Sequence, residues 1–219
     1  MANRTLTISE ELQQYVIDHS TPLDEVARDL IEETHANLPR QSGMQIAPEQ
    51  AGFLTLLTRA LGVRRAVEVG TFTGYSSLAI ARGLAEGGTM LCCDVSEEWT
   101  SIAQRYWKRA GVADRIELKI APALETLAAL PDEPTIDLVF IDADKGNYIG
   151  YWDALVPRVR PGGVILVDNT LWSGEVVNPG NTEPNTVAIR AFNDHAAADD
   201  RVDLQLLPLA DGITYAVRR

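Results

Sequence analysis

The stretch "RAVEVGTFTGYSS", Arg65–Ser77, contains the transition that decides the fold. Its first residues predict a short buried strand over 65–70, and the sequence from Tyr75 onward predicts a helix. Gly70 and Gly74 lie between them, and glycine permits a tight turn and lets a ligand approach the backbone closely. A strand, a glycine-containing turn and a helix indicate the first unit of an α/β domain.

The same alternation of strand and helix continues along the chain. Further strands are predicted over 89–95, 115–120, 136–142 and 163–169, and helices over 48–62, 75–84 and 97–110. Apolar strands that alternate with helices indicate a mainly parallel sheet covered on both faces. The last two segments, 201–209 and 213–219, instead predict an antiparallel hairpin that turns around Asp211.

The length of 219 residues suits one domain, 1–219, without repeats or linkers. We expect an N-terminal helical segment, 1–43, before a core over 44–219. Within that segment Thr21 is the predicted helix cap, with Pro22 at the first helical position.

Composition predicts a soluble globular protein, with 46% hydrophobic and 23% charged residues. No apolar run approaches the ~20 residues that cross a bilayer, so no membrane association is expected. The N-terminal sequence "MANRTLTISEELQQ" lacks the apolar stretch of a secretory signal, which predicts a cytoplasmic protein. The net charge of -12 argues against nucleic acid as a partner.

Two acidic residues flank the glycine turn in the expected sheet. Ligands of open parallel sheets bind beyond the carboxyl ends of the strands, where Glu68 and Asp94 lie. The spacing of Gly70 and Gly74 is not that of dinucleotide-binding proteins, and no phosphate-binding lysine motif is present. Asp94 suits ribose hydroxyls, and the missing phosphate cradle favours the cationic S-adenosylmethionine. The alternative is a structural turn with solvated acids.

Three oxygen-bearing side chains end the next two strands. Asp142 follows one strand, Asp168 and Asn169 follow its successor, and strands ~4.8 Å apart would let the three converge. Two carboxylates and an amide favour Mg²⁺, Mn²⁺ or Ca²⁺, whereas the alternative for Asp168 and Asn169 is an ordinary turn. Lys145 could act as a base beside such a cation, or be a surface lysine paired with Asp144.

Four blocks of this sequence resemble one known family. The blocks are "MQIAPEQ" (44–50), "VEVGTFTGYSS" (67–77), "FIDADKGNY" (140–148) and "VDNTLWSGEV" (167–176). They resemble the cation-dependent O-methyltransferases typified by caffeoyl-CoA O-methyltransferase, including bacterial members that methylate catechols. The resemblance implies a Rossmann-like class I S-adenosylmethionine-dependent methyltransferase fold, a seven-stranded sheet and a homodimer.

The resemblance also implies roles for individual residues. Contacts to S-adenosylmethionine fall on Met44, Ile46, Glu68, Gly70, Thr71, Ser76, Asp94, Ala123, Asp142 and Asp144. The metal falls on Asp142, Asp168 and Asn169, and Lys145 corresponds to the general base. Trp172 opens the loop to Asn185, which is expected to contact the acceptor. Pro122 departs from the family pattern, because an acidic residue often stands there.

The leading hypothesis is methylation of one hydroxyl of a small catechol, such as a precursor in secondary metabolism, with the metal binding both adjacent oxygens. A hydroxyuridine-modifying tRNA methyltransferase and a non-catalytic binding module are alternatives. A caffeoyl-CoA-type thioester is a third, but an acyl carrier needs cationic contacts. The N-terminal segment offers only Arg4, Arg28 and Arg40 for such contacts, which favours a small aromatic catechol instead.

Overall fold

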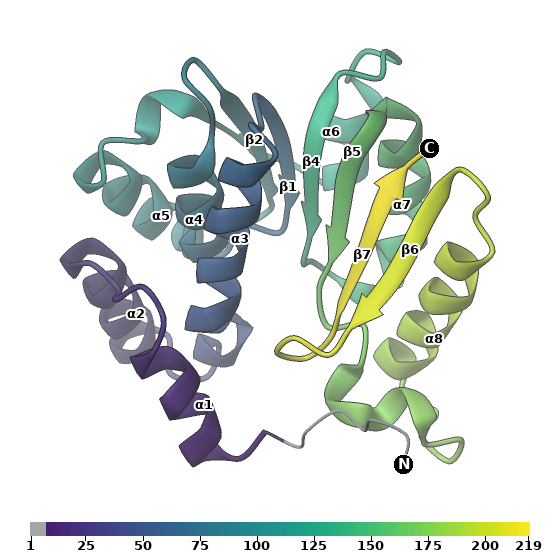
Figure 1. Ribbon diagram of the computed structural model, residues 1–219, viewed down its shortest axis with the longest axis horizontal. Coiled ribbons are helices and arrows are strands. Elements are labelled where there is room, and N and C mark those ends of the chain that lie inside the picture. The colour runs from purple at the N-terminus through teal and green to yellow at the C-terminus, as the bar shows by residue number, and fades with distance from the viewer. Residues whose placement is uncertain (1–7) are drawn as a thin grey trace.

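The computed structural model describes residues 8–219 as a seven-stranded sheet in the order β3-β2-β1-β4-β5-β7-β6 (Figure 1). The strands are β1 (Arg65–Val69), β2 (Thr89–Asp94), β3 (Ile116–Ile120), β4 (Ile136–Ile141), β5 (Val159–Val167), β6 (Val202–Leu207) and β7 (Ile213–Arg218). Strands β1 to β5 pair in parallel, and β7 runs antiparallel to both β5 and β6. The predicted parallel sheet with a C-terminal hairpin is therefore confirmed.

Eight α-helices accompany the sheet within the described residues. They are α1 (Glu10–Asp18), α2 (Glu25–Asn37), α3 (Pro48–Ala60), α4 (Tyr75–Gly83), α5 (Glu97–Arg109), α6 (Ala123–Ala128), α7 (Tyr148–Leu155) and α8 (Pro184–Ala197). One apolar core joins α2 to α5 with one face of the sheet, and a second joins α6 to α8 with the other. No helix in this described part is both long and apolar enough to span a bilayer.

The cap predicted for the second helix is wrong. The α2 helix begins at Glu25, and the Asp24 side chain accepts a hydrogen bond from Ala27 N at 2.8 Å. Asp24 lies three residues before Ala27, whose amide has no partner within the helix, and it also pairs with Arg82. Asp24 therefore caps the helix in place of Thr21. Residues 1–7 of the predicted N-terminal helical segment lie outside the described part of the chain.

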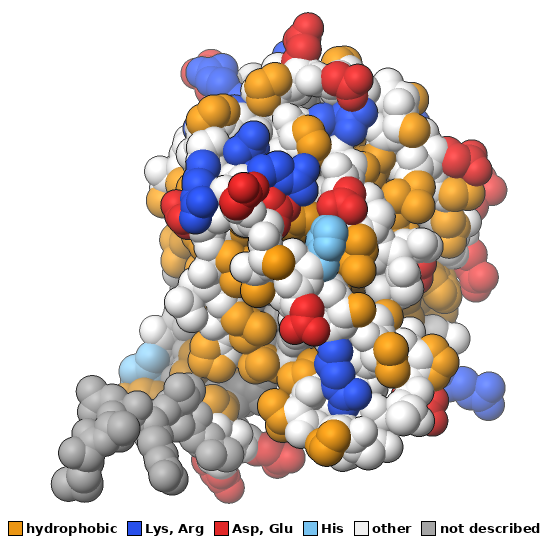
Figure 2. Space-filling model, turned by 90° about the vertical axis from the view of Figure 1, so that its right-hand side faces the viewer, with side chains coloured by type: hydrophobic (Ala, Val, Ile, Leu, Met, Phe, Trp, Pro, Cys, Tyr) orange, Lys and Arg blue, Asp and Glu red, His pale blue; other side chains and the backbone are white. Residues whose placement is uncertain are grey.

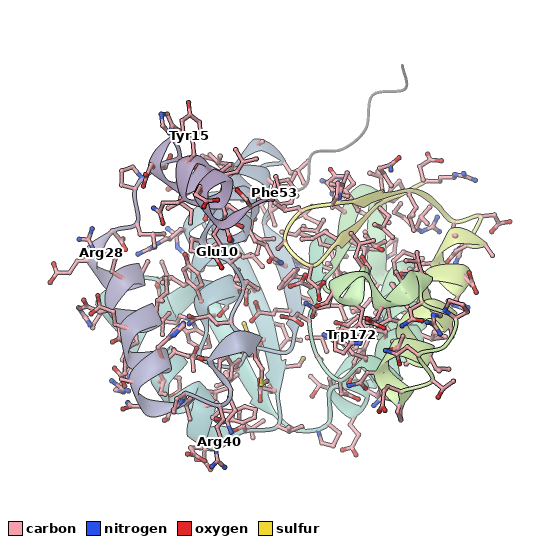
Figure 3. All side chains as sticks on the ribbon, turned by 90° about the horizontal axis from the view of Figure 1, so that it is seen from below. Glu10, Tyr15, Arg28, Arg40, Phe53 and Trp172 are labelled. Carbon is pink, nitrogen blue, oxygen red and sulfur yellow. The ribbon has the colours of Figure 1, made fainter. Side chains whose placement is uncertain are left out.

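The sheet hydrogen bonding continues one residue beyond β4 and β5. Asp142 N donates to Val69 O at 2.8 Å, and Asp168 N donates to Ile141 O at 2.9 Å. The ends of β1, β4 and β5 therefore lie at one level, on the lower edge in Figure 1. Figure 3 looks onto this edge from below and places Trp172 on it. The fold thus gathers the strand-end acids where a ligand can reach them.

Candidate active site

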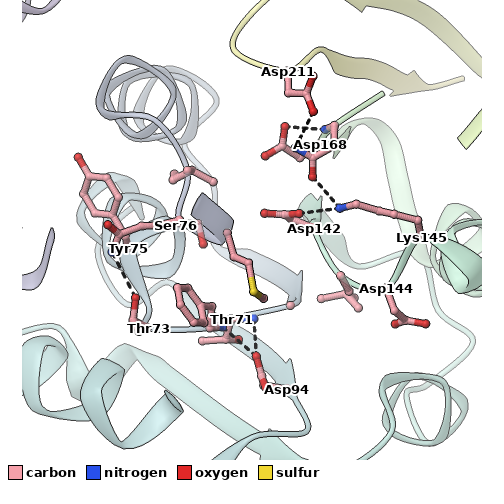
Figure 4. A pocket seen from close by; sticks show the side chains of 18 of the residues that line it. Thr71, Thr73, Tyr75, Ser76, Asp94, Asp142, Asp144, Lys145, Asp168 and Asp211 are labelled. Carbon is pink, nitrogen blue, oxygen red and sulfur yellow. Dashed lines mark hydrogen bonds and ion pairs between the residues drawn. The ribbon is translucent and has the colours of Figure 1, made fainter. Parts of the chain in front are cut away.

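A cavity of about 920 Å³ opens at the carboxyl edge of the parallel strands. Thirteen of the residues predicted from sequence line it: Met44, Ile46, Gly70, Thr71, Ser76, Asp94, Ala123, Asp142, Asp144, Lys145, Asp168, Asn169 and Trp172. Asp94 and Thr71 lie on one side, and Asp142, Lys145 and Asp168 lie on the other (Figure 4). Two groups of polar residues therefore face a shared space.

The turn after β1 is shaped by glycine and by Asp94. Gly70 has a φ of +91°, and a Cβ there would lie 1.9 Å from Asp142 O, so no other residue fits without moving β4. Asp94 Oδ2 accepts hydrogen bonds from Thr71 N at 2.9 Å and Phe72 N at 2.8 Å. Asp94 therefore orders the turn, and a carboxylate retains further acceptor capacity toward the cavity.

Beside Asp94 the lining is apolar. Val95 is 70% exposed, and Trp99 packs edge-to-face on Phe72 with ring centroids 5.2 Å apart. Ala123, at the start of α6, also lines the cavity, and Pro122 is the N-cap residue of that helix. An uncovered apolar slot next to a carboxylate fits a planar base joined to a sugar, and no basic side chain lines it to hold a phosphate.

Glu68 does not line the cavity. Its side chain is fully buried, and neither carboxylate oxygen has a hydrogen-bond partner among the described residues. Burial raises the pKa of Glu68 to about 8, an effect that nearby Ser76, Cys92 and Thr71 partly oppose. The carboxyl group is therefore neutral at pH 7, and its contact with a cofactor stays a prediction.

Lys145 lies among the oxygen atoms on the far side of the cavity. Its Nζ donates to Asp142 Oδ1 at 3.0 Å, to Asn169 Oδ1 at 2.6 Å and to Tyr148 OH at 2.6 Å. The Lys145 side chain is only 9% exposed. The alternative of a surface lysine paired with Asp144 is therefore wrong, because the end of β4 turns Lys145 inward. Asp144 instead accepts from Asn147 Nδ2 at 2.6 Å.

Asp168 is the most enclosed of the acids that line the cavity, with 3% exposure. Its Oδ1 accepts from Asn169 N, and its Oδ2 accepts from Gln50 Nε2, both at 2.7 Å. Burial and the neighbouring charge of Asp142 raise the pKa of Asp168 to about 7. Sequence reasoning missed Gln50, although it ends the block "MQIAPEQ", because its partner lies 118 residues away.

The oxygen cluster fits a divalent cation. No group of three His, Cys, Asp or Glu side chains gathers for a metal within residues 8–219, but the set here is two carboxylates and one amide. The Lys145 ammonium between Asp142 and Asn169 shows that the position accepts positive charge. Hard oxygen donors of this kind suit Mg²⁺, Mn²⁺ or Ca²⁺.

Backbone strain is concentrated around the same cavity. The non-glycine residues of the described chain with positive φ are Phe72, Asn169, Trp172, Ser173 and Ala210, and all five line it. Left-handed conformations in such residues cost on the order of 1–3 kcal/mol each and persist where the surrounding structure imposes them. The strained residues of the described chain are therefore gathered at this cavity.

Two aromatic rings lie near the Lys145 ammonium. Lys145 Nζ lies 4.8 Å from the ring centroid of Tyr148 and 5.7 Å from that of Trp172. Asn185, at the other end of the predicted acceptor loop, also lines the cavity. Tyr148 was not predicted, although it ends the block "FIDADKGNY". Of these two rings only Trp172 lines the cavity, whereas Tyr148 is fully buried and contacts Lys145 from within the protein.

Negative charge predominates around the cavity. Among the described residues that line it, Lys145 is the one basic side chain, and the acidic ones are Asp94, Asp142, Asp144, Asp168 and Asp211. Arg28 and Arg40 do not line it, and Arg4 lies outside the described residues. The cavity therefore favours cationic ligands over polyanionic ones.

Comparisons with known proteins agree with this geometry. A family model described as O-methyltransferase matches residues 17–219. A probable caffeoyl-CoA O-methyltransferase 2 of Dictyostelium discoideum is 44% identical, over 96% of this chain and 92% of its own length. The catechol O-methyltransferase domain-containing protein 1 of Mus musculus is 38% identical, over 81% of this chain and 69% of its own length.

A solved structure extends the comparison to three dimensions. The O-methyltransferase from Bacillus cereus, crystallised in complex with SAH, superposes with a TM-score of 0.87. It is 34% identical, and the match covers 95% of this chain and 97% of that one. The two chains therefore share the class I methyltransferase fold.

Proposed function

Because the chain belongs to the O-methyltransferase family, we propose that it methylates one hydroxyl of a small catechol, using S-adenosylmethionine and a divalent metal ion. One observation carries the proposal. Lys145 Nζ, Asp142 and Asn169 meet at one point, across the cavity from the glycine turn. A base and a hard oxygen ligand set therefore face the space where a methyl donor would lie.

The cofactor is proposed to lie along the turn after β1. Asp94 would accept hydrogen bonds from the ribose hydroxyls, and the adenine ring would lie beside Val95 and Ala123. Met44 and Ile46, on the segment before α3, would cover the bound cofactor. Support comes from the acidic lining, which suits a sulfonium and an ammonium group, and from the SAH-bound Bacillus cereus relative.

The metal is assigned to Asp142, Asp168 and Asn169. A divalent cation held there would lower the pKa of a coordinated hydroxyl and favour acceptors with two adjacent oxygens. The side chain of Gln50 holds Asp168 in place through a 2.7 Å hydrogen bond. The raised pKa of Asp168 means that a proton competes with the metal near neutral pH.

Lys145 is assigned the role of general base, which takes the proton of the reacting hydroxyl. In its unprotonated form Nζ accepts that proton, while the hydroxyl oxygen forms a bond to the methyl carbon and the carbon–sulfur bond breaks. S-Adenosylhomocysteine and the methyl ether are then the products. Asp142 and Tyr148 hold Nζ in position, and Trp172 borders the acceptor, so most of the rate gain comes from orienting two reactants.

The charge of the cavity favours a small acceptor over a coenzyme A thioester. A thioester of that kind carries several phosphate charges, and the described lining offers only Lys145 as a basic group. A secondary metabolite precursor with adjacent hydroxyls meets the same requirements. A homodimer is proposed from the family resemblance.

A tRNA acceptor is the second candidate, and surface charge weighs against it. Figure 2 shows the face beside β6, where Lys and Arg side chains are interspersed with Asp and Glu. Arg201 pairs with Asp199, and Arg219 pairs with Asp203. These two arginines are therefore compensated by neighbouring carboxylates, whereas phosphate binding needs uncompensated positive charge.

The test is a methyl-transfer assay on a panel of catechols, with and without exhaustive chelation, followed by identification of the methylated oxygen. We expect turnover of vicinal dihydroxy compounds, loss of at least about 100-fold on chelation and recovery with added Mg²⁺ or Mn²⁺. Catechols blocked at one oxygen are the matched control and should not react. Full activity after metal removal would contradict the proposed metal dependence, and retention on tRNA at physiological salt would favour the second candidate.

A further inference from the structure

Asp211 lies in the turn between β6 and β7 and reaches across to the loop that follows β5. It lines the cavity, and Figure 4 shows it close to Asp168. Its Oδ2 accepts a hydrogen bond from Asn169 Nδ2 at 3.4 Å, and its Oδ1 accepts one from Ser173 N at 2.5 Å. One carboxylate therefore holds two positions of that loop.

The amide of Asn169 has a charged neighbour on each side. Lys145 Nζ, which can only donate, lies 2.6 Å from Oδ1. The carboxylate of Asp211, which can only accept, faces Nδ2. The two neighbours require the same orientation of the amide, with its oxygen toward Lys145 and its nitrogen toward Asp211. When Lys145 turns to a substrate, Asp211 is the neighbour that still dictates this orientation.

The backbone of the turn makes Asp211 a rigid anchor. Leu171 N donates to Asp211 O at 2.9 Å, and Thr170 N donates to Gly212 O at 3.0 Å. Gly212 has a φ of +89°, and a Cβ there would lie 2.6 Å from Leu171 N. The hairpin therefore packs directly against the loop, and the carboxylate of Asp211 starts from a fixed position.

We propose that Asp211 is a positioning residue that presents the oxygen of Asn169 to the metal and fixes the turn that carries Trp172. The inference rests on the proposed function, because it assigns Asn169 to the metal. A ligating carboxylate needs no partner to fix its orientation, since both of its oxygen atoms can bind a cation. An amide binds only through oxygen, so a partner that holds its nitrogen directly affects affinity.

The test is a titration of the whole protein with Mn²⁺ by calorimetry, which does not depend on turnover. Asp211→Asn keeps an acceptor for Ser173 N but turns a donor toward Asn169, which drives the Asn169 amide to flip its nitrogen toward the cation. We expect Mn²⁺ affinity to fall by about 10-fold. In an Asn169→Asp background the same substitution should not weaken Mn²⁺ binding, because a carboxylate accepts from the new amide and still offers oxygen to the metal.

Asp203→Asn is the matched control on the same hairpin, since Asp203 pairs with Arg219 on the surface away from the cavity. It should bind Mn²⁺ like the wild-type protein. S-Adenosylhomocysteine affinity, measured in parallel, should be unchanged in Asp211→Asn and so reports an intact fold.

Three results would overturn the inference. Equal Mn²⁺ affinity of wild type and Asp211→Asn would remove the positioning role while leaving the metal site intact. Equal losses in the wild-type background and in the Asn169→Asp background would show that Asp211 acts through charge alone. A wild-type protein that binds no Mn²⁺, or binds it equally after Asp142→Asn, would overturn the metal site itself and the inference with it.

Discussion

At the scale of single residues, the contacts of Lys145 depend on its position in the fold more than on its neighbours in the sequence. Its sequence neighbours Asp142 and Asp144 are both acidic, but only Asp142 contacts it. The remaining hydrogen bonds are with Tyr148, three residues later, and with Asn169, just past the end of β5. Contacts from two strand ends therefore hold the Lys145 side chain inside the cavity.

Lys145→Met tests the proposed role of Lys145 as general base. Methionine keeps the length of the side chain and removes the amine, so we expect kcat to fall by about 100- to 10,000-fold. Mn²⁺ and S-adenosylhomocysteine should bind at least as tightly as in the wild type, because no ligand atom is lost. Lys119→Met is the control, since Lys119 is exposed and pairs only with Glu117. Near-normal turnover of the Lys145 variant would leave the reaction without its proposed base.

Glu68 makes folding stability depend on pH. Its pKa is 4.5 in the unfolded chain and about 8 in the folded protein. Between these values the unfolded chain has lost the proton that the folded protein keeps, so the free energy of unfolding falls as pH rises. Below pH 4.5 both states are protonated, and this destabilisation is absent.

Glu68→Gln removes this titration. From about pH 5.5 to about pH 8 we expect the wild type to lose roughly 2–3 kcal/mol more stability than the variant. Urea unfolding at the two pH values gives the difference, and the titration of Asp168 cancels because both proteins contain it. Parallel pH profiles for the two proteins would show that Glu68 is ionised when folded.

At the scale of elements, the junction between β1 and α4 depends on close packing as well as on glycine conformation. Gly74 is the N-cap of α4 with a φ of +85°. A Cβ there would lie 2.4 Å from Ala103 Cβ and 2.9 Å from Trp107 Nε1, both on α5. The turn therefore brings α4 against α5, and no side chain can be inserted between them.

Gly74→Ala and Gly62→Ala separate these two effects. Gly62 also has a positive φ, +61°, but a Cβ there meets nothing within 4 Å. Both substitutions carry the conformational cost of about 1 kcal/mol. The free energy of unfolding of Gly74→Ala should be lower than that of Gly62→Ala by roughly 1–3 kcal/mol, because α5 must move to admit the new methyl group. Chemical denaturation measures both, and equal losses would mean that α5 adjusts freely.

At the scale of the whole molecule, the acidic cavity predicts how acceptors are ranked. We expect dopamine to be methylated with a kcat/KM roughly 5- to 10-fold above that of protocatechuate, because the acidic lining repels the carboxylate of protocatechuate and attracts the ammonium of dopamine. The two compounds share the catechol ring, which makes each the control for the other. High salt should narrow the gap, and a preference for protocatechuate would refute the electrostatic ranking.

Most of the fold was predictable from the sequence, because strands and helices follow local patterns. The alternation around Val67–Ser77 placed β1 and α4 within two residues of their observed bounds. Cys92 and Cys93 are neighbours on β2 and point into opposite cores, because successive side chains of a strand alternate between its faces. The Thr21 cap failed because capping depends on which side chain reaches a free amide, and that geometry is absent from composition.

The sequence by itself determined which residues end each strand, and therefore that Asp94, Asp142 and Asp168 would share one edge of a parallel sheet. Only the tertiary structure decided which partners complete them. Gln50 meets Asp168 across 118 residues, and Asp211 meets Asn169 across 42. Such contacts depend on the order of strands and on how the hairpin folds back, and no local periodicity encodes either.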